Sequence, residues 1–334
     1  MLKNNLFYLN KIKNVVFLGA CNVFDELIKI NKNINLNSFI VSSPDQLKNI
    51  KTNFKIKTFQ KLDKKFKSYI KEQINIDETL FVSLGSRWIF NKKIITDFFK
   101  SNLVNFHGTR LPYDAGGGVF SWKIIREDRI DNQLVHLVDE GIDTGPILYN
   151  DKSIIPSSCK LPIDFENYRN KSFIKFYKKF INLLKKKKKL TLKNQPDYIG
   201  RYNPRLDTKT NGWIDWNTSS YHLIRFLNAF DNPYPGASTM IKNNKRVYIK
   251  KAHLHGGETT NHPYMSGLIS RHDKKWIVVS TRDENMILIE EVLDKKNKNI
   301  ISTLKPGDRF FTPPKELYLS RKTRVRFNAK GIKK

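Results

Sequence analysis

Short apolar runs alternate with helical patterns from Asn14 to about Pro146. Residues 15–19 are apolar at every position, which is typical of a strand covered on both faces, and the apolar positions after them recur at helical spacing. Further strands are predicted at residues 37–41, 79–84, 103–107 and 133–138, and a short helix at residues 92–99. Strands that alternate with helices are typical of a parallel α/β sheet.

The pattern changes near residue 211. Before that point, a stripe of apolar residues predicts a long helix at residues 165–184. After it, four apolar residues at i, i+3, i+4 and i+7 predict an amphipathic helix capped by Thr218 or Ser219. Five short strands with turn residues between them are then predicted at residues 238–241, 246–250, 268–270, 276–280 and 286–290. Short strands at this spacing are typical of a small β-barrel.

These patterns predict an α/β protein in which a Rossmann-like open parallel sheet is followed by a small OB-like β-barrel. We expect the first domain at residues 1–195, a linker at residues 196–210, the barrel domain at residues 211–320 and a basic tail at residues 321–334. A length of 334 residues agrees with two domains. Hydrophobic residues make up 39% of the chain, enough to build cores, which excludes a disordered protein.

The charge balance is strongly basic. The chain has 61 Lys and Arg against 31 Asp and Glu, a net charge of +30. Such a charge indicates a polyanionic partner, whether nucleic acid, an anionic membrane or a phosphorylated substrate. The excess is mostly Lys, accompanied by many Asn and Ile residues, and a genome-wide codon bias toward A and T produces the same composition. We favour the codon bias over a dedicated nucleic-acid surface.

The cysteine content and the apolar runs bear on the compartment. Cys21 and Cys159 cannot form a disulfide framework for a chain of this size, which agrees with a reducing environment. No apolar run approaches the ~20 residues of a membrane span. The apolar stretch before Cys21 is shorter than the ~7–15 residues of a signal-peptide core. We therefore expect a cytoplasmic protein.

Polar residues follow two of the predicted strands, at residues 105–112 and 139–145. In an open parallel sheet, ligands bind beyond the carboxyl ends of the strands. Asn105 and His107 are two positions apart on a strand end, so their side chains point to the same side. An amide and an imidazole there can jointly donate to an oxyanion, and Asp143 can fix the imidazole tautomer and stabilise its charge. A strand-end Asn or His alone is more often a hydrogen-bonded loop residue, so only the three together indicate catalysis.

The two segments also match known signatures. The first reads Asn105-Phe106-His107-Gly108-Thr109-Arg110-Leu111-Pro112, and the second reads Asp139-Glu140-Gly141-Ile142-Asp143-Thr144-Gly145-Pro146-Ile147. They resemble the patterns Asn-x-His-x-Ser-x-Leu-Pro and Asp-x-Gly-x-Asp-Thr-Gly-x-Ile of the tetrahydrofolate-dependent formyltransferases. Residues 212–216 and 228–237 resemble the carboxyl-terminal barrel of that family, so the resemblance covers about residues 14–315. Thr109 and Arg110 depart from the pattern, which usually has Ser and often Leu at these positions.

The resemblance implies roles for three catalytic residues. Asn105 would polarise the formyl carbonyl of 10-formyltetrahydrofolate and hold the tetrahedral oxyanion. His107 would assist proton transfer from the attacking amine, and Asp143 would orient His107 and support its charge. The carbonyl would be activated by hydrogen bonds alone, so the resemblance implies no metal.

The resemblance also implies where the folate co-substrate binds. Residues 83–90, which begin at the end of the strand predicted at residues 79–84, resemble the family's pterin-binding segment. Glu140, Gly141 and Ile142 would form the opposite wall of the pterin site. Plain core packing is the alternative explanation for Trp88 and Ile89. The residues expected to bind the cofactor are Ser86, Arg87, Trp88, Ile89, Asp139, Glu140 and Gly141.

Three acceptors or functions compete. The first is the amine of a nucleoside-diphosphate amino sugar, and the second is initiator methionyl-tRNA, which the charge favours. The third is a nucleic-acid-binding barrel protein whose first domain has lost activity, which the intact Asn105, His107 and Asp143 argue against. A formyltetrahydrofolate hydrolase, or transfer to a different amine, is the remaining alternative. The tRNA enzymes usually carry a longer loop, rich in glycine and arginine, where this chain runs Ser42-Ser43-Pro44-Asp45-Gln46, so the chain is most like the sugar N-formyltransferases. We expect a small-molecule acceptor, with tRNA as the alternative, and no membrane partner. The expected oligomeric state is compatible with a homodimer.

Overall fold

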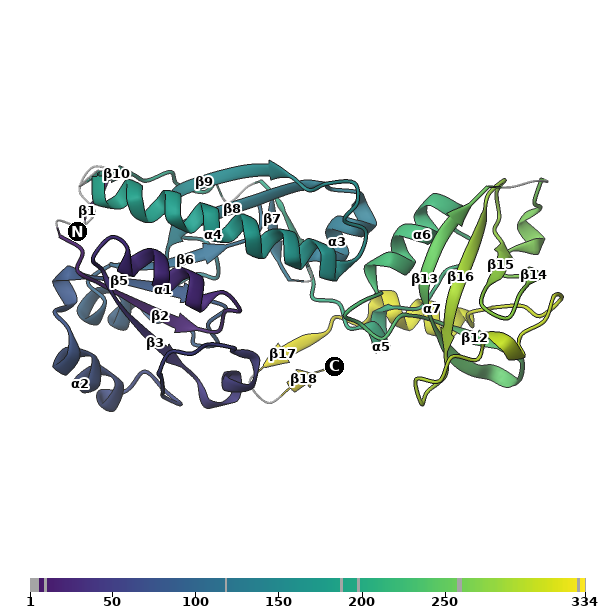
Figure 1. Cartoon of the computed structure of the whole chain (residues 1–334), viewed down its shortest axis with the longest axis horizontal. Helices are drawn as coiled ribbons and strands as arrows, with labels where there is room; N and C mark the ends of the chain where they lie inside the picture. The colour runs from purple at the N-terminus through teal and green to yellow at the C-terminus, as the bar shows by residue number, and fades with distance from the viewer. Residues whose placement is uncertain are drawn as a thin grey trace. The chain divides into compact units, whose positions relative to one another are not determined.

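The computed structural model of the chain describes residues 6–8, 11–117, 119–186, 189–196, 199–256, 260–328 and 331–333 (Figure 1). The predicted linker and the predicted basic tail each fall partly outside these ranges. The chain divides into two compact units. The first comprises Met1–Ala115, Ile130–Ile154 and Tyr168–Tyr202, and the second comprises Gly116–Arg129, Ile155–Asn167 and Asn203–Lys334.

The first unit contains a seven-stranded sheet with the strand order β4-β3-β2-β5-β6-β8-β9. The bounds are Ile56–Thr58 (β4), Asn37–Ser42 (β3), Asn14–Gly19 (β2), Thr79–Leu84 (β5), Leu103–His107 (β6), Ile130–Leu137 (β8) and Ile147–Ile154 (β9). The strands from β4 to β6 are parallel, which confirms the α/β class with a large parallel-containing sheet.

Two strands of this sheet differ from the expectation. β8 runs antiparallel to β6, and β9 runs antiparallel to β8. Placing residues 133–138 in a wholly parallel sheet was therefore wrong. The physical reason is that a buried apolar run has the same side-chain pattern whichever direction its neighbour runs.

Both faces of the sheet are covered, as the apolar run in β2 predicts. Val15 and Phe17 belong to a core shared with α1 (Phe24–Lys32) and α4 (Pro162–Lys186). Val16 and Leu18 belong to a second core, shared with α2 (Lys64–Gln73) and the π-helical turn η3 (Ile94–Phe98). Successive side chains of a strand point to opposite faces, so each of these apolar positions has a core to enter.

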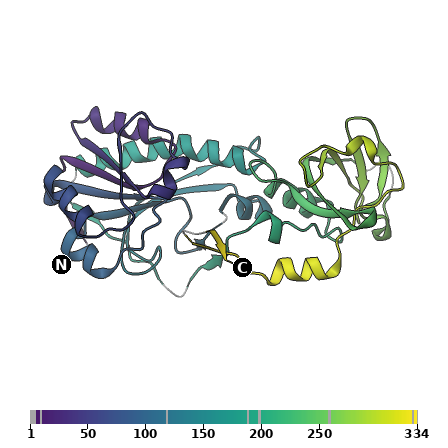
Figure 2. The ribbon, with the colours of Figure 1, turned by 90° about the horizontal axis from the view of Figure 1, so that it is seen from below.

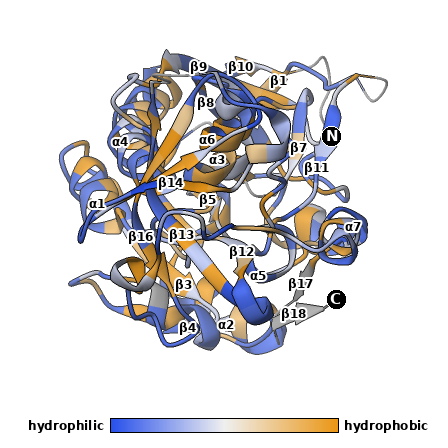
Figure 3. Ribbon diagram, turned by 90° about the vertical axis from the view of Figure 1, so that its right-hand side faces the viewer, coloured by the Kyte–Doolittle hydropathy of each residue, from blue (hydrophilic) through white to orange (hydrophobic). Residues whose placement is uncertain are grey.

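Phe106 anchors the end of β6 to α4, which runs alongside the sheet (Figure 2). Its ring contacts four aromatic rings of α4 at centroid distances of 5.4–5.9 Å, namely Phe173, Phe176, Tyr177 and Phe180. Blue and orange alternate along α4 in Figure 3, as in an amphipathic helix. Because side chains alternate along a strand, anchoring Phe106 on α4 directs Asn105 and His107 to the other side.

The second unit contains a five-stranded sheet with the order β12-β13-β16-β15-β14 and antiparallel pairing. The bounds are Ala237–Ile241 (β12), Lys245–His255 (β13), Ile269–His272 (β14), Ile277–Ser280 (β15) and Met286–Leu293 (β16). α6 (Ser220–Ala229) packs against α3 (Val119–Arg126) and β13. The five strands and α6 lie where the sequence predicts them, whereas α3 has no sequence prediction.

Within the described residues, the five strands of the second unit form an open sheet, because the edge strands β12 and β14 do not pair with each other to close a barrel. A later segment adds one bridge near each edge strand, since Phe311 pairs with Met240 and Arg309 pairs with Leu268. The backbone N–H of Met240 donates to the carbonyl of Phe311 at 2.8 Å.

The remaining elements are short. β1 (Leu6–Tyr8) pairs with β10 (Lys189–Thr191), β7 (Asp114–Gly116) with β11 (Arg201–Asn203), and β17 (Arg326–Asn328) with β18 (Gly331–Lys333). The short helices are η1 (Pro44–Asn49), η2 (Ile76–Glu78), α5 (Thr208–Asn211), η4 (Lys242–Asn244), η5 (Pro263–Met265), η6 (Ile301–Thr303) and α7 (Pro314–Lys322). No helix in the described part of the chain has the length and apolar character needed to cross a membrane.

Candidate active site

The three residues expected to be catalytic lie together in the first unit. Nδ1 of His107 is 3.6 Å from Oδ1 of Asp143, and Nδ2 of Asn105 donates to the same carboxylate oxygen at 3.4 Å. Asn105 and His107 come from the end of β6, and Asp143 comes from the loop between β8 and β9. The contact between His107 and Asp143 is longer than a hydrogen bond, and catalytic contacts of this kind commonly tighten when substrates bind.

A fourth polar residue, His136 on β8, completes this cluster. The strand register places it directly opposite Asn105. Its Nδ1 lies 2.7 Å from the carbonyl oxygen of Leu137. A carbonyl only accepts, so Nδ1 of His136 carries the hydrogen, and in the neutral ring Nε2 is the acceptor. Nδ2 of Asn105 therefore donates to Nε2 of His136, at 3.1 Å.

These contacts distinguish the free groups of the cluster from the engaged ones. Both contacts of the Asn105 amide nitrogen lie inside the cluster, so Asn105 must exchange one of them to donate to an oxyanion. Nε2 of His107, in contrast, is buried and has no hydrogen-bond partner among the described residues. Such an atom is costly to leave unpaired, so a substrate that supplied its partner would be favoured there.

The sequence did not single out His136, which lies in the predicted strand at residues 133–138. Its importance follows from its position opposite Asn105, and that position depends on the antiparallel pairing of β6 and β8. Residues directly opposite each other share one face of a sheet. No signal in a single sequence gives this register, so His136 became visible only in the structure.

The loop that carries Asp143 is held from two directions. Asp143 has a positive φ of 61°, a left-handed conformation that Asp adopts more readily than most residues. Nε2 of Gln195 donates to the backbone carbonyls of Asp143 and Gly145, at 3.0 and 2.7 Å. A Cβ at Gly145 would lie 1.9 Å from the carbonyl oxygen of Leu137, so only glycine fits there. These contacts fix the Asp143 carboxylate beside His107.

The three predicted cofactor-binding residues of this loop have different surroundings. Oδ1 of Asp139 accepts hydrogen bonds from the backbone N–H of Gly141 at 3.2 Å and from Oγ1 of Thr144 at 2.7 Å, so this carboxylate organises the loop. A Cβ at Gly141 would lie 2.0 Å from Oγ1 of Thr144. Glu140 is exposed and pairs with Lys92 at 3.3 Å, which brings the loop next to the segment after β5.

The four predicted cofactor-binding residues after β5 also differ in exposure. Arg87 pairs with Asp45, and Oγ of Ser86 accepts from the backbone N–H of Trp88 at 3.2 Å. Trp88 is half-buried and packs against the core beneath it, in line with the alternative explanation of core packing. Ile89 is 85% exposed.

A second exposed isoleucine stands on the loop that carries Asp143. This residue, Ile142, is 82% exposed. An exposed large apolar side chain needs no explanation when it stands alone. Here one such side chain stands on each of the two segments that the sequence predicts as opposite walls of a pterin site, and the pair of Lys92 with Glu140 joins those segments.

Gly108, directly after His107, lies against a buried polar network. A Cβ at this position would lie 2.6 Å from Nη1 of Arg169, so a larger residue would displace that guanidinium. Arg169 pairs with the buried Asp131 at 3.1 Å, and Oγ of Ser172 donates to the same carboxylate at 2.8 Å. The sequence did not indicate this network, because its members are spread over β8 and α4.

The environment of the cluster sets its protonation. Burial lowers the pKa of His107 to about 4; the Asp143 carboxylate opposes this shift, and the charges of His136 and Arg169 add to it. Burial raises the pKa of Asp143, but the neighbouring imidazoles of His136 and His107 outweigh it, so the pKa lies below its ordinary value. At neutral pH the cluster therefore holds an ionised Asp143 and a neutral His107 that can accept a proton.

This low pKa predicts a pH dependence of stability. Between pH 4 and 6.5 an unfolded chain binds a proton at His107 and the folded chain does not, so the free energy of unfolding should fall as the pH falls through this window. The slope should be about 1 kcal/mol per pH unit for this group. Urea unfolding of His107→Asn at several pH values should lack this component, whereas the exposed His253→Gln should keep it. Equal slopes in all three proteins would contradict the assignment.

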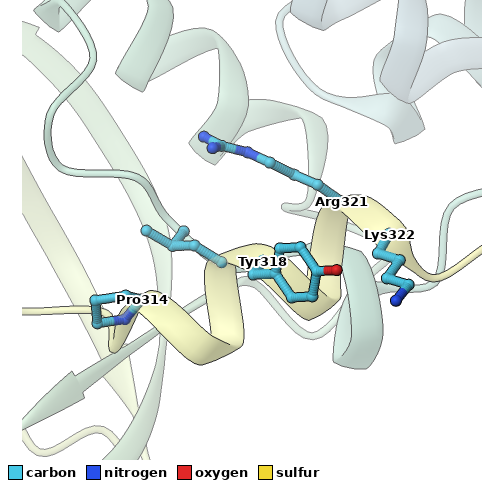
Figure 4. Close-up of a pocket in the computed structure, with 5 residues that line it drawn as sticks. Pro314, Tyr318, Arg321 and Lys322 are labelled. Atoms are coloured by element: carbon cyan, nitrogen blue, oxygen red, sulfur yellow. The ribbon is translucent and has the colours of Figure 1, made fainter.

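A pocket of about 500 Å³ lies on α7 of the second unit. It is lined by Pro314, Leu317, Tyr318, Arg321 and Lys322 (Figure 4). All five belong to one helix, and none is a predicted site residue, so we place the active site at the polar cluster and not at this pocket. In the described ranges, no group of three or more His, Cys, Asp or Glu side chains is arranged so that it could hold a metal ion.

The chain is similar to known formyltransferases. Residues 207–305 match the family model described as "Formyl transferase, C-terminal domain". A methionyl-tRNA formyltransferase of Prochlorococcus marinus (strain MIT 9515) is 27% identical over 266 residues, which covers 69% of this chain and 75% of the relative.

Solved structures share the fold. WlaRD, a sugar 3N-formyl transferase solved in the presence of dTDP and 5-N-formyl-THF, has a TM-score of 0.59 at 20% identity and covers 84% of this chain and 98% of its own. The methionyl-tRNA formyltransferase from Clostridium thermocellum has a TM-score of 0.50 at 19% identity, over 72% of this chain and 93% of its own. The matched carboxyl-terminal domain and the sequence relatives support a formyl-transfer enzyme of the folate-dependent formyltransferase kind, and the solved structures share its fold.

Proposed function

We propose that this enzyme transfers a formyl group from 10-formyltetrahydrofolate to the amine of a nucleotide-linked amino sugar. The proposal of formyl transfer rests on the cluster of Asn105, His107 and Asp143, in which Nε2 of His107 has no hydrogen-bond partner among the described residues. The observation that carries the choice of acceptor is the short segment between β3 and β4.

In this proposal the folate co-substrate supplies an activated formyl group, and three side chains handle the charge and the proton. The neutral His107 accepts the proton of the attacking amine at Nε2 as the new C–N bond forms, and later returns it to the departing folate nitrogen. Asp143 stabilises the transient imidazolium. Asn105 exchanges one contact inside the cluster and donates to the oxyanion.

The residues around the cluster fit a folate. Ile89 and Ile142 offer apolar side chains from two adjoining segments, and a ring placed between them would cover both. We propose that Ser86, Arg87, Trp88 and Ile89 line one wall and that Asp139, Glu140 and Gly141 line the other, with Asp139 acting through the shape of its loop. WlaRD, which shares the fold, was solved in the presence of 5-N-formyl-THF.

The segment between β3 and β4 favours a small acceptor. Residues 43–55 contain neither glycine nor arginine. The segment begins with the 3-10 helix η1 and is tied to the first unit, because Nε2 of Gln46 donates to the carbonyl of Gly85 at 2.8 Å and Asn53 donates to Asp25 at 3.1 Å. A loop bound down in this way differs from the longer loop, rich in glycine and arginine, that is usual in the tRNA enzymes.

Initiator methionyl-tRNA remains the second candidate, because the sequence relatives carry that name and the chain has a net charge of +30. A tRNA enzyme needs many phosphate contacts, which Lys and Arg supply. We give this candidate less weight because a codon bias accounts for the excess of Lys, and because residues 43–55 contain neither glycine nor arginine.

We also propose an OB-like barrel for the five strands of the second unit, with residues 307–311 closing the gap between its edges. The support is the pairing of Phe311 with Met240 and of Arg309 with Leu268. We retain residues 1–195, 196–210 and 211–320 as catalytic domain, linker and barrel domain. A cytoplasmic location is proposed from the two free cysteines, Cys21 and Cys159.

The proposed function is tested with a panel of acceptors. The full-length enzyme with 10-formyltetrahydrofolate is expected to formylate at least one nucleoside-diphosphate amino sugar, detected by mass spectrometry, and to leave charged initiator tRNA unchanged. The Michaelis constant for the sugar nucleotide should rise only slightly between ~50 and ~200 mM salt, because a diphosphate makes one or two charge contacts. The apparent affinity for a tRNA acceptor would fall about tenfold or more over the same range of salt concentration.

A matched variant removes basic residues from the carboxyl-terminal tail. Deleting residues 326–334 leaves the buried Val325 and the pair of Arg321 with Asp215 in place. The deletion should not change the Michaelis constant of a sugar nucleotide. Formylation of tRNA alone, or a large loss of affinity on deletion, would overturn the proposed acceptor.

A further inference from the structure

Two arginines of the first unit share one buried carboxylate. Nε of Arg201 donates to Oδ1 of Asp114 at 2.8 Å, and Nη2 of Arg110 donates to Oδ2 of the same residue at 3.4 Å. Asp114 is buried, whereas the side chains of Arg110 and Arg201 are 34% and 54% exposed. The carboxylate thus holds both guanidinium groups at one place on the surface of the first unit.

The backbone around Arg110 is firmly anchored. Thr109 and Leu111, on either side of it, are buried, and Nδ2 of Asn132 donates to the carbonyl of Thr109 at 3.2 Å. The backbone N–H of Arg201 donates to the carbonyl of Tyr113 at 3.0 Å, which joins the two arginine-bearing segments. The positions of the two guanidinium groups are therefore set before any ligand binds, which lowers the entropy cost of binding.

The pair has more positive charge and more donors than Asp114 uses. Two guanidinium groups against one carboxylate leave a net charge of +1. Each guanidinium has five N–H donors, and the contacts with Asp114 engage one nitrogen of each. Nε of Arg110 has no hydrogen-bond partner among the described residues. If Asp114 only needed neutralising, one arginine would suffice, so the second is available for another anion.

The chemistry of the surroundings matches a phosphorylated ligand. Arginine presents a planar fork of donors that fits phosphate oxygens two at a time. Tyr113 is 49% exposed, and the Arg110 guanidinium carbon lies 5.4 Å from the centre of its ring. An exposed aromatic ring beside arginines is a surface on which a nucleobase can stack.

Resting on the proposed function, we propose that Arg110 and Arg201 bind the phosphate groups of the acceptor, the diphosphate in the case of an amino-sugar nucleotide. Arg110 follows His107 by three residues, a chain distance of at most about 10 Å. A phosphate held there keeps the rest of the acceptor within reach of His107. Because Arg110 stands where the family pattern often has Leu, this anchor is a specificity feature of this chain.

The anion site is tested by isothermal titration of inorganic pyrophosphate into the full-length protein. Arg110→Leu and Arg201→Gln should each weaken pyrophosphate binding about 10- to 100-fold, as expected for loss of charge-assisted hydrogen bonds. Arg282→Leu, an exposed arginine of the second unit, serves as the matched control and should bind like the wild type. Thermal melting checks that each variant is folded. Arg110→Lys keeps the charge that Asp114 needs but loses the fork, and should weaken binding by an intermediate factor.

The same variants distinguish failure of this inference from failure of the proposed function. With a sugar nucleotide as acceptor, Arg110→Leu should raise the Michaelis constant and leave the turnover number nearly unchanged. If the wild type formylates a sugar nucleotide and neither variant changes its Michaelis constant or pyrophosphate binding, the inference is overturned and the proposed function stands. If only tRNA is formylated while pyrophosphate binding still needs both arginines, the proposed acceptor fails and the anion site stands with a tRNA phosphate as its ligand.

Discussion

Replacing His107 with alanine is expected to lower the turnover number about 10²- to 10³-fold while the protein stays folded. His107 has its Nδ1 beside Asp143 and its Nε2 buried without a partner in the described residues. Its low pKa keeps the ring neutral at neutral pH, so it is ready to take a proton from an amine. Removing a proton acceptor or an oxyanion donor commonly has an effect of this size.

The measurement is single-turnover formyl transfer with saturating folate and acceptor, alongside thermal melting. Asn105→Ala should lose a similar factor, because it removes the amide that reaches Asp143 and His136. His253→Ala, on β13 of the second unit, removes an exposed histidine and is the matched control. Full activity in Asn105→Ala or His107→Ala, with unchanged melting, would show that the active site lies elsewhere.

Asp143→Asn is expected to lower turnover by about 10²- to 10⁴-fold while folate still binds. The substitution keeps the shape of the side chain and removes the negative charge 3.6 Å from Nδ1 of His107. Burial already disfavours the charged form of His107, and Asp143 provides the main opposing interaction. Without it, the imidazolium formed during the reaction would lie in a buried site with no counter-charge, and the barrier would rise.

The design separates binding from chemistry. Folate affinity is measured by fluorescence titration, and turnover is measured per bound complex. Asp151→Asn, which removes an exposed carboxylate paired with Lys179 on the edge strand β9, should leave both quantities unchanged. A collapse of folate affinity in Asp143→Asn with normal turnover per complex would make Asp143 a binding residue instead.

The sequence predicted elements well where burial determines the pattern. β2 and β5 are buried at every position and mostly apolar because helices cover both sides of the sheet. Their bounds and those of β6 agree with the prediction to within one residue. β9 escaped prediction because it lies at the edge of the sheet, and most of its residues are at least partly exposed. A strand with polar residues on its open side resembles a loop in sequence.

The candidate site was predictable to a similar extent. Asn105 and His107 could be paired because two residues on one strand share a side by geometry alone. Asp143 could be joined to them because its loop also follows a predicted strand, and the family resemblance supported this grouping. Its exact place could not be predicted, because Asp143 lies 38 residues beyond Asn105 in the chain. His136 and Arg169 depend on strand direction and helix docking, which are properties of the assembled fold.

The contact between Gln195 and the loop of Asp143 has a consequence for how the enzyme is made. Fifty-two positions separate the two residues, and the amide of Gln195 holds the backbone carbonyls of Asp143 and Gly145. Domains begin to fold from their amino-terminal end while the ribosome is still adding residues. All strands of the sheet are present once β9 has been synthesised, but the carboxylate of Asp143, to which we assign a catalytic role, lacks its contact with Gln195 until residue 195 has left the ribosomal tunnel. A nascent chain would therefore form its sheet before the Asp143 carboxylate is held in its final position.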